Sequence, residues 1–280
     1  MANNLRVFNT NSEYQSADLV HPAVSYVIET DKVIYEPTTP PTPVFQGKWK
    51  AIYQDSHVES AQCDSSSAIT QNEINKTNLV SIELGSCVRS IYTWALNAID
   101  SLTKIVVNPN NTVYNSQNNC NAIIETSTNT LLTGCISTVI PNNVTAIGQY
   151  AFQGCTGLTN IHIPNSVTYI GPQAFYQCSG ITSLDIPDSV TTIATNAFNN
   201  CSSLTSVTIG SGITSIGSYA FSFDKELVSI TIKANVPPSL SYAALDDSNN
   251  CRIYVPASSV EAYKSASGWD GYKYRIQPIP

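Results

Sequence analysis

Charged side chains are scarce in this chain. Only 12% of the 280 residues are Asp, Glu, Lys or Arg, about half of the usual share, while hydrophobic residues make up 42%. Disordered chains combine low hydrophobicity with high net charge, so the composition excludes a disordered protein. Basic residues are the scarcer kind, because 13 Lys and Arg against 20 Asp and Glu give a formal charge of −7. Binding of nucleic acid needs clustered basic side chains, so no nucleic acid partner is expected.

Long apolar segments are also missing. No stretch approaches the roughly 20 apolar residues of a membrane-spanning helix, so we expect no membrane insertion. The first ten residues, Met1 to Thr10, lack the apolar core of a secretion signal. We therefore expect synthesis in the cytoplasm without a signal peptide.

Residues that bind metals or cofactors are few and scattered. The chain has eight cysteines without a C-x-x-C pair or zinc-finger spacing. The segment from Asp246 to Asn250 is acidic, but it lacks the glycine and the terminal Glu of an EF-hand loop. We expect a polar turn there and no metal or cofactor.

The three histidines offer no catalytic arrangement. His21 lies near the N-terminus, His57 lies beside Asp55 in an expected turn with a surface hydrogen bond, and His162 lies in an expected strand. General acid–base catalysis needs a reacting group within about 3 Å of the base, in a pocket that excludes water. Flat strand faces rarely supply such a pocket, so the sequence predicts a protein that is not an enzyme.

What the chain does contain is a repeat of 23 residues, which reads I-P-x-x-V-T-x-I-x-x-x-A-F-x-x-C-x-x-L-T-x-I-x. A fixed period of roughly 20 to 50 residues indicates a solenoid, in which successive coils stack. The apolar positions that keep the period include Phe152, Phe175, Phe198 and Phe221; Ile147, Ile170, Ile193 and Ile216; and Leu158, Ile181, Leu204 and Leu227.

A single unit cannot fold alone. Its L-T-x-I-x-I segment alternates, the following Pro ends that strand, V-T-x-I forms a second short strand, and A-F-x-x-C forms a helical turn whose Phe fills the coil. Burying a large side chain contributes about 1.5–3 kcal/mol, whereas ordering one residue costs about 1–2 kcal/mol. Stacking supplies the second buried face, so we predict a mainly β solenoid with short helical turns and coils of about 23 residues.

The solenoid is predicted over residues 79–233. Leu96 belongs to an earlier irregular coil and lies 56 residues before Phe152, ten more than two units. The extra length falls at about 108–135, where residues 122–125 and 130–133 flank a turn. We predict a β-hairpin that projects from the stack.

Both ends of the solenoid are predicted to carry caps. Residues 234–280 lose the period and contain an expected strand at 252–255 and a short helix at 260–265, with Ser258 and Glu261 at capping-box spacing. Trp269, Tyr272, Tyr274 and Ile276 are expected to cover the last coil. Residues 44–78 form the other cap, with a hairpin of 49–53 and 57–61 and a second capping-box pair, Thr70 and Glu73.

The N-terminal segment, residues 1–36, is separated from the rest by a proline-rich linker at 37–43. A hairpin of residues 24–29 and 32–36 is expected within it. Thirty-six residues are too few for a core of their own, so the segment is predicted to dock on another protein. Its candidate docking residues are Tyr14, Val24, Tyr26, Ile28 and Tyr35.

Three cysteines share one place in successive units. Cys155, Cys178 and Cys201 predict a ladder of small buried thiols, since free cysteine is commonly interior. A disulfide between Cys120 and Cys135 is conceivable, and their spacing does not decide it. The whole set is typical of a reducing compartment.

The outward strand face is the candidate binding surface. A solvated β-surface explains these polar residues, and so does a hydrogen-bonding face for a glycan or protein. His162 and Asp185 are its strongly polar groups and lie one coil apart. The candidate ligand-binding residues are Asn160, His162, Ser183, Asp185, Ser206 and Thr208.

The run V-I-P-N-N-V-T-A-I-G-Q-Y-A-F at 139–152 and its successors resemble the BspA-like leucine-rich repeats of anaerobic gut and oral bacteria. C-R-I-Y-V-P-A-S-S-V-E-A-Y at 251–263 is similar to the ending that those proteins share. The resemblance covers about residues 79–280. It implies a leucine-rich-repeat solenoid that acts as an adhesin or protein-binding scaffold, with no catalytic residues to transfer.

The N-terminal third carries a second resemblance. F-N-T-x-x-x-Y at 8–14, H-P-x-V-S-Y-V at 21–27 and K-W-K-A-I-Y at 48–53 are similar to the leader of structural proteins in Bacteroides-type phages. This implies a virion decoration, head-fibre or tail-fibre protein that docks on other virion proteins through residues 1–36 and displays its repeats to a host surface protein or glycan. The alternative is a bacterial cell-surface adhesin, and a homo-oligomer is compatible with both.

Overall fold

The computed structural model describes residues 7–8, 25–29, 32–36, 44–246, 248 and 251–280. The chain divides into two compact units, Met1–Phe45 and Gln46–Pro280. Among the described residues, none of the helices has the length and apolar character needed to cross a membrane.

The described part of the first unit is a three-stranded antiparallel sheet in the order β1-β3-β2. β1 is Val7–Phe8, β2 is Ser25–Glu29 and β3 is Lys32–Glu36, so the predicted hairpin is confirmed from residue 25 onward. Tyr26 is the register partner of Tyr35. Tyr14, Val24 and the linker at 37–43 lie outside the described residues.

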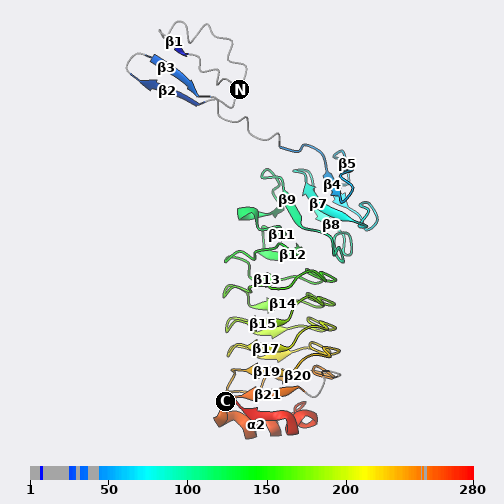
Figure 1. Ribbon diagram of the computed structural model, residues 1–280, viewed down its shortest axis with the longest axis vertical. Coiled ribbons are helices and arrows are strands. Elements are labelled where there is room, and N and C mark those ends of the chain that lie inside the picture. The colour runs from blue at the N-terminus through cyan, green and yellow to red at the C-terminus, as the bar shows by residue number, and fades with distance from the viewer. Residues whose placement is uncertain (1–6, 9–24, 30–31, 37–43, 247, 249–250) are drawn as a thin grey trace. The chain divides into compact units, whose positions relative to one another are not determined.

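The second unit is a stack of coils in which each coil adds one short strand to each of two sheets (Figure 1). The parallel strands of neighbouring coils pair residue for residue at the repeat interval, as in Tyr169 with Thr192 and Thr192 with Ser215. The predicted mainly β solenoid with coils of about 23 residues is therefore confirmed. One sheet contains β10 (Tyr114–Asn115), β11 (Ala122–Glu125), β12 (Thr130–Gly134), β13 (Ala146–Ile147), β14 (Tyr169–Ile170), β16 (Thr192–Ile193), β18 (Ser215–Ile216) and β20 (Ser239–Leu240). The other contains β15 (Ser183–Ile186), β17 (Ser206–Ile209), β19 (Ser229–Ile232), β21 (Arg252–Val255) and β22 (Ile276–Pro278).

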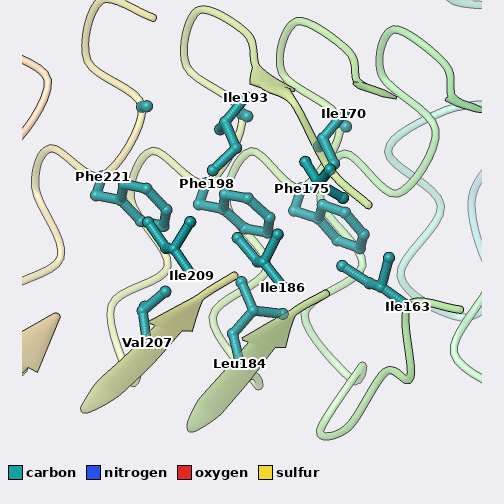
Figure 2. Close-up of a cluster of buried hydrophobic side chains, with 14 of the residues drawn as sticks. Ile163, Ile170, Phe175, Leu184, Ile186, Ile193, Phe198, Val207, Ile209 and Phe221 are labelled. Carbon is teal, nitrogen blue, oxygen red and sulfur yellow. The ribbon is translucent and has the colours of Figure 1, made fainter. Parts of the chain in front are cut away.

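The core between the two sheets is a column of stacked phenylalanine rings (Figure 2). Phe152, Phe175, Phe198 and Phe221 have no solvent exposure, and successive ring centroids lie 4.9, 5.0 and 5.2 Å apart with nearly parallel planes. Ile170 and Ile193 pack from one sheet, and Leu184, Ile186 and their successors pack from the other. One aromatic residue per coil thus fills the interior, as the repeat predicts.

The A-F-x-x-C segment is a series of tight turns and not the predicted helical turn. In the first regular coil the amide of Cys155 donates to the carbonyl of Phe152 over 3.0 Å. Tyr150 and its equivalents Gln173 and Asn196 have φ of 62°, 54° and 57°, which a right-handed helix does not accept. The left-handed residue in each coil turns the chain back before a helix can form.

The predicted ladder of buried thiols is confirmed, and it has a fourth member of another kind. Cys178 and Cys201 donate from Sγ to the carbonyls of Phe152 and Phe175, over 3.0 and 3.2 Å. Burial raises the pKa of both thiols well above the usual value. The next coil carries Asp224 at this place, with no solvent exposure. Its Oδ1 accepts from the amide of Cys201 over 2.7 Å, and its Oδ2 has no partner.

The hairpin predicted at 122–125 and 130–133 is present, but it does not project from the stack. β12 pairs in parallel with β13, and Ile123, Ile124 and Leu131 have no solvent exposure. The antiparallel pair β11–β12 therefore extends one sheet of the solenoid. Gly134 ends it where the ring of Phe152 comes so close that a Cβ would lie 2.1 Å from a ring carbon.

The N-terminal cap is a four-stranded sheet in the order β5-β4-β7-β9. β4 is Trp49–Tyr53, β5 is Val58–Ala61, β7 is Leu79–Leu84 and β9 is Lys104–Val107, so the predicted hairpin of 49–53 and 57–61 is confirmed to within one residue. β6 (Ala68–Ile69) and β8 (Ser90–Ile91) form a separate parallel pair, and η1 (Gln117–Asn119) is a 3₁₀ turn.

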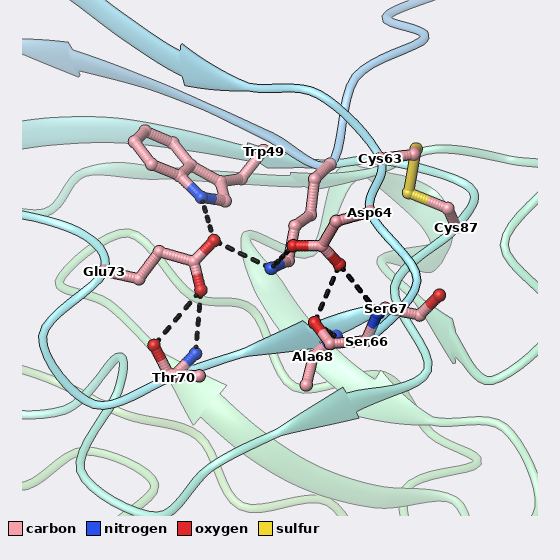
Figure 3. Close-up of polar contacts among 10 residues, drawn as sticks. Trp49, Cys63, Asp64, Ser66, Ser67, Ala68, Thr70, Glu73 and Cys87 are labelled. Carbon is pink, nitrogen blue, oxygen red and sulfur yellow. Dashed lines mark hydrogen bonds and ion pairs between the residues drawn. A yellow bond between two sulfur atoms is a disulfide. The ribbon is translucent and has the colours of Figure 1, made fainter.

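A buried lysine holds the loops of this cap together (Figure 3). Lys48 is 2% exposed, and its Nζ lies 2.8 Å from Asp64 and 2.9 Å from Glu73. Glu73 also accepts from the indole of Trp49 over 2.9 Å and from the amide of Thr70 over 3.0 Å. The capping-box pair Thr70 and Glu73 therefore closes a turn, and no helix follows it in the described chain.

A disulfide between Cys63 and Cys87 clamps the same cap (Figure 3). Cys120 and Cys135 are both free and buried, so the pairing considered from the sequence does not form. The expectation of a wholly reduced cysteine set is wrong. The reason is spatial, because the chain from β5 and the turn after β7 bring two cysteines 24 residues apart to a Cα separation of 6.1 Å.

The C-terminal cap contains η2 (Ala257–Ser259), α2 (Val260–Ser265) and η3 (Asp270–Arg275). The strand at 252–255 and the helix at 260–265 are confirmed, but the capping box is wrong, because Ser259 takes the N-cap position without a side-chain cap bond. Trp269 and Ile276 are buried and Tyr272 packs against the core, as expected. Tyr274 is 87% exposed, so its predicted place over the last coil is wrong.

Candidate binding surfaces

The outward face of the sheet β15-β17-β19-β21 carries two straight rows of polar side chains. Ladder pairing aligns residues 183, 206, 229 and 252 in one row and 185, 208, 231 and 254 in the next. The residues between them point inward, and Leu184, Val207 and Ile230 are buried. Alternation along each strand therefore separates a polar outer face from the apolar core.

The candidate residues of this face all reach solvent to some degree. Asn160, His162, Ser183, Asp185 and Ser206 are exposed, and Thr208 is partly exposed. Asp185 is the register partner of Thr208, and Ser183 is the partner of Ser206. The structure therefore brings four of the six into one ladder.

Asn160 and His162 occupy the equivalent place one coil earlier, but residues 158–164 are not in a strand. The described ion pairs do not include one between His162 and Asp185. The regular polar ladder thus begins at β15, and the expected strand at His162 is wrong. The hairpin β11–β12 belongs to the other sheet, so it forms no wall beside this ladder.

Two residues of this face were not anticipated from the repeat. β21 adds Arg252 and Tyr254 to the two rows, as the register partners of Ser229 and Thr231. Residues 252–255 were read as part of the cap because they lie outside the 23-residue period. Their alternation, with Ile253 and Val255 buried, is the signal that could have placed them on the face.

The remaining histidine with a polar neighbour lies in the N-terminal cap. His57 Nδ1 lies 2.5 Å from Asp55 Oδ1, and its ring stacks on Tyr53 with centroids 4.1 Å apart. The hydrogen bonds from the His57 ring and amide hold the pKa of Asp55 below its usual value. This is the expected surface hydrogen bond.

Within the described parts of the chain, no group of three or more His, Cys, Asp or Glu side chains could hold a metal ion. Asp246 instead accepts from the hydroxyl of Tyr272 over 2.6 Å. Asp247, Asn249 and Asn250, which complete that acidic segment, lie outside the described residues.

The repeat matches a known family. Residues 53–133 and 132–252 match the family described as BspA type leucine rich repeat region (6 copies). The chain belongs to this family. Leucine-rich repeats of this kind generally serve as non-catalytic scaffolds, and the two matches together include both the irregular first coil and the regular ones.

Solved structures share the BspA-type fold. A leucine rich cell surface protein from Faecalibacterium prausnitzii A2-165 is 24% identical with a TM-score of 0.59, and the match covers 78% of this chain and 57% of that one. A leucine-rich repeat protein from Eubacterium ventriosum is 20% identical, with a TM-score of 0.42 and coverage of 61% and 58%. The pneumococcal vaccine antigen PcpA is 18% identical, with a TM-score of 0.46 and coverage of 72% and 55%.

The BspA-type chain spans just over half of the length of each of these proteins. A comparison with curated proteins finds no match.

Proposed function

We propose that this BspA-type repeat protein is a non-catalytic binding scaffold displayed at a bacterial cell surface. Its contact surface is the outward face of β15, β17, β19 and β21, and its partner is a host surface protein or glycan. The observation that carries the proposal is the pair of straight polar rows, four ladder positions long, on that face.

The physical argument rests on order and flatness. The side chains of the rows stand on strands that are already fixed by ladder hydrogen bonds, so binding orders little additional backbone. Ser, Thr and Tyr side chains both donate and accept hydrogen bonds, which suits a broad polar partner. A flat face contacts a macromolecule better than a small substrate, and extended faces are the usual binding surfaces of solenoids.

The surface of the F. prausnitzii neighbour's cell is named in its description as a leucine rich cell surface protein. This supports the same location here. Antibody labelling of intact cells of the producing bacterium, without permeabilisation, tests the location directly. Labelling that needs permeabilised cells would contradict it.

The binding face is tested by measuring binding of gut-surface glycans and host-cell proteins to wild type and to His162→Ala/Asp185→Ala. A second variant, Ser206→Arg, introduces a bulky charge in the middle of the first row. The matched control is Tyr169→Ala, an exposed residue of the other sheet. We expect both face variants to lose binding and the control to keep it. If a ligand binds the face variants as well as wild type, the binding site lies elsewhere.

A second candidate uses the same face in a phage virion, as a decoration or fibre protein docked through residues 1–36. The observation that favours it is the separate compact unit at Met1–Phe45, whose described strands pair with one another. The docking residues proposed are Tyr14, Val24, Tyr26, Ile28 and Tyr35.

Mass spectrometry of purified virions tests this candidate, together with deletion of residues 1–43. We expect the truncated protein to fold, because unit Gln46–Pro280 holds its own core, and to be missing from particles. A truncated protein that is incorporated normally would show that the N-terminal segment does not dock.

A further inference from the structure

A pocket of about 210 Å³ opens between the irregular first coil and the hairpin and turn that follow it. None of its lining residues carries a charge. They come from the turn after β8, from β12 and from the turn after β13: Ile91, Tyr92, Thr93, Trp94, Leu96, Asn97, Leu132, Thr133, Gln149 and Tyr150. The pocket lies in the other sheet's edge of the solenoid and shares no residue with the polar rows of the outward face.

Two aromatic rings form one wall of this pocket. The rings of Trp94 and Tyr150 have centroids 4.2 Å apart and are tilted by 37°. Tyr92 beside them is 60% exposed, and Trp94 is 38% exposed. The other two tryptophans, Trp49 and Trp269, are buried in the two caps. Trp94 therefore leaves a large apolar ring face open to solvent at one place.

The fold does not require aromatic residues at these positions. Trp94 and Tyr150 occupy the same place in their coils, with φ of 73° and 62°. The following coils carry Gln173, Asn196 and Tyr219 there, with φ between 54° and 57°. The turn thus accepts an amide side chain as readily as a ring, and the pairing of two rings at the pocket needs another explanation.

A buried amide lies in the pocket wall next to the rings. Asn97 is 8% exposed, and its Nδ2 donates to Gln153 over 3.1 Å. Its Oδ1 is hidden from solvent and accepts no hydrogen bond. The loop that carries it is held by Lys76, whose Nζ donates to the carbonyls of Trp94 and Asn97. Buried acceptors are nearly always paired, so an unpaired one in a pocket wall points to a missing donor.

We infer that this pocket binds a single neutral saccharide ring. A pyranose presents C–H groups on its face, which pack on aromatic rings, and hydroxyls on its edge, which pair with amide and hydroxyl groups such as those of Asn97, Gln149 and Thr133. A purely apolar ligand would leave the Asn97 acceptor unpaired. An acidic or phosphorylated sugar would meet no basic side chain in the lining. Pockets for drug-sized molecules measure roughly 300–1,000 Å³, so this smaller one suits one ring.

Saturation-transfer NMR on the full chain tests the inference with defined probes. The neutral probes are the methyl glycosides of glucose, galactose, mannose and N-acetylglucosamine at millimolar concentration. The charged probes are glucuronic acid and glucose 6-phosphate. We expect at least one neutral glycoside to bind and to protect Trp94 from iodide quenching of its fluorescence, and neither charged probe to bind as tightly.

The variants Trp94→Gln and Tyr150→Gln remove one ring each while keeping the side chain that Gln173 shows the turn to accept. We expect each to weaken binding of the neutral glycoside about tenfold. Tyr219→Gln is the matched control, because Tyr219 has the same place in a coil outside the pocket, and it should bind as wild type does. A urea titration of each variant verifies that the fold is intact.

Three results would overturn the inference: none of the neutral glycosides binds, the charged probes bind equally well, or Trp94→Gln and Tyr150→Gln bind like wild type. A peptide ligand for the pocket would appear as the first of these results. The inference is independent of the proposed outward face, because Ser206→Arg should leave glycoside binding unchanged. Failure of one site is therefore distinguishable from failure of the other.

Discussion

Phe175 has an aromatic neighbour on both sides, whereas Phe221 stacks on Phe198 alone. Truncating a buried Phe loses its transfer free energy and leaves a cavity that the neighbours fill only in part. Phe175→Ala should therefore lower the free energy of unfolding by about 3–5 kcal/mol, and Phe221→Ala by less. Urea titration followed by circular dichroism measures both. Equal losses would mean that the irregular cap packs Phe221 as tightly as a regular coil packs Phe175.

Asp224 is a residue whose burial makes stability depend on pH. Burial raises the pKa of its carboxyl from the usual 3.8 to about 8, against a smaller lowering by the amide of Cys201. Between these values the native state holds a proton that the unfolded chain releases. The contribution of Asp224 to stability is thus largest below pH 4, falls as the pH rises from about 4 to about 8, and is level above that.

Asp224→Cys restores the residue that the other coils carry at this place. We expect it to remove that part of the pH dependence and to raise the free energy of unfolding at pH 8 by about 1–3 kcal/mol, the usual cost of an unpaired buried polar group. Urea titrations at pH 5 and pH 8 compare the variant with wild type. Asp185→Asn controls for loss of an exposed negative charge. A gain of equal size at both pH values would show that Asp224 stays protonated throughout or is replaced for packing reasons alone.

Which residues are predictable from sequence depends on whether they keep the period. Phe175 and Cys178 keep it, and both lie where the repeat places them. Asp224 keeps the position but changes the residue type, so the repeat gives no warning of a buried carboxyl. Trp94 lies in an irregular coil, and its contact with Tyr150 depends on how two coils of different length are joined.

At the scale of elements, strands were predicted more reliably than their surroundings. Alternation of apolar residues locates β4, β11, β12 and β21 closely, because it records which side of each strand is buried. It does not record which element covers that side. The hairpin β11–β12 was therefore expected to project, although its buried Ile123 and Leu131 make it part of the sheet. Capping-box spacing was also misleading where the chain forms turns.

The disulfide ties β5, an edge strand of the N-terminal cap, to the turn after β7. Closing a loop of this length restricts the unfolded chain and contributes about 3 kcal/mol. Cys63→Ser/Cys87→Ser should therefore lower the melting temperature and speed hydrogen exchange of the amides in β4 and β5, with little change in β17 and β19. Mass spectrometry after exchange gives the comparison by segment. Uniform acceleration along the chain would mean that the cap and the coils unfold as one unit.

At the scale of the molecule, the solenoid itself follows from the repeat, because one coil buries a single face and must stack. The ends do not follow from it. Each end must cover an apolar layer with residues that have no equivalent elsewhere in the chain. At the C-terminus Trp269 donates to the carbonyl of Pro238 and Tyr263 donates to that of Ala234, both over 2.9 Å. The candidate face was predicted where it keeps the period, in β15 and β17, and was missed where the cap extends it.

Removing residues 256–280 tests the role of that cap. The deletion uncovers the edge of β21 and the apolar layer beneath Trp269, so we expect a protein that self-associates and unfolds at lower urea concentration. The control deletes one whole internal unit, residues 187–209, and leaves both caps in place. Size-exclusion chromatography should show the control as a monomer-sized species of the same state as wild type and the truncated protein as larger species. A truncated protein that elutes as wild type does would mean that α2 and η3 do not seal the end.

The constant register between successive coils has a consequence for how such a gene can change. Because each coil offers its neighbour the same residues at the same heights, a duplication or loss of 23 codons inside the regular region joins without a mismatch. Each such event would move the outer tip of the column by one strand spacing, about 4.8 Å. Reach is therefore a property that unequal recombination can adjust in small steps, while both ends of the protein stay as they are.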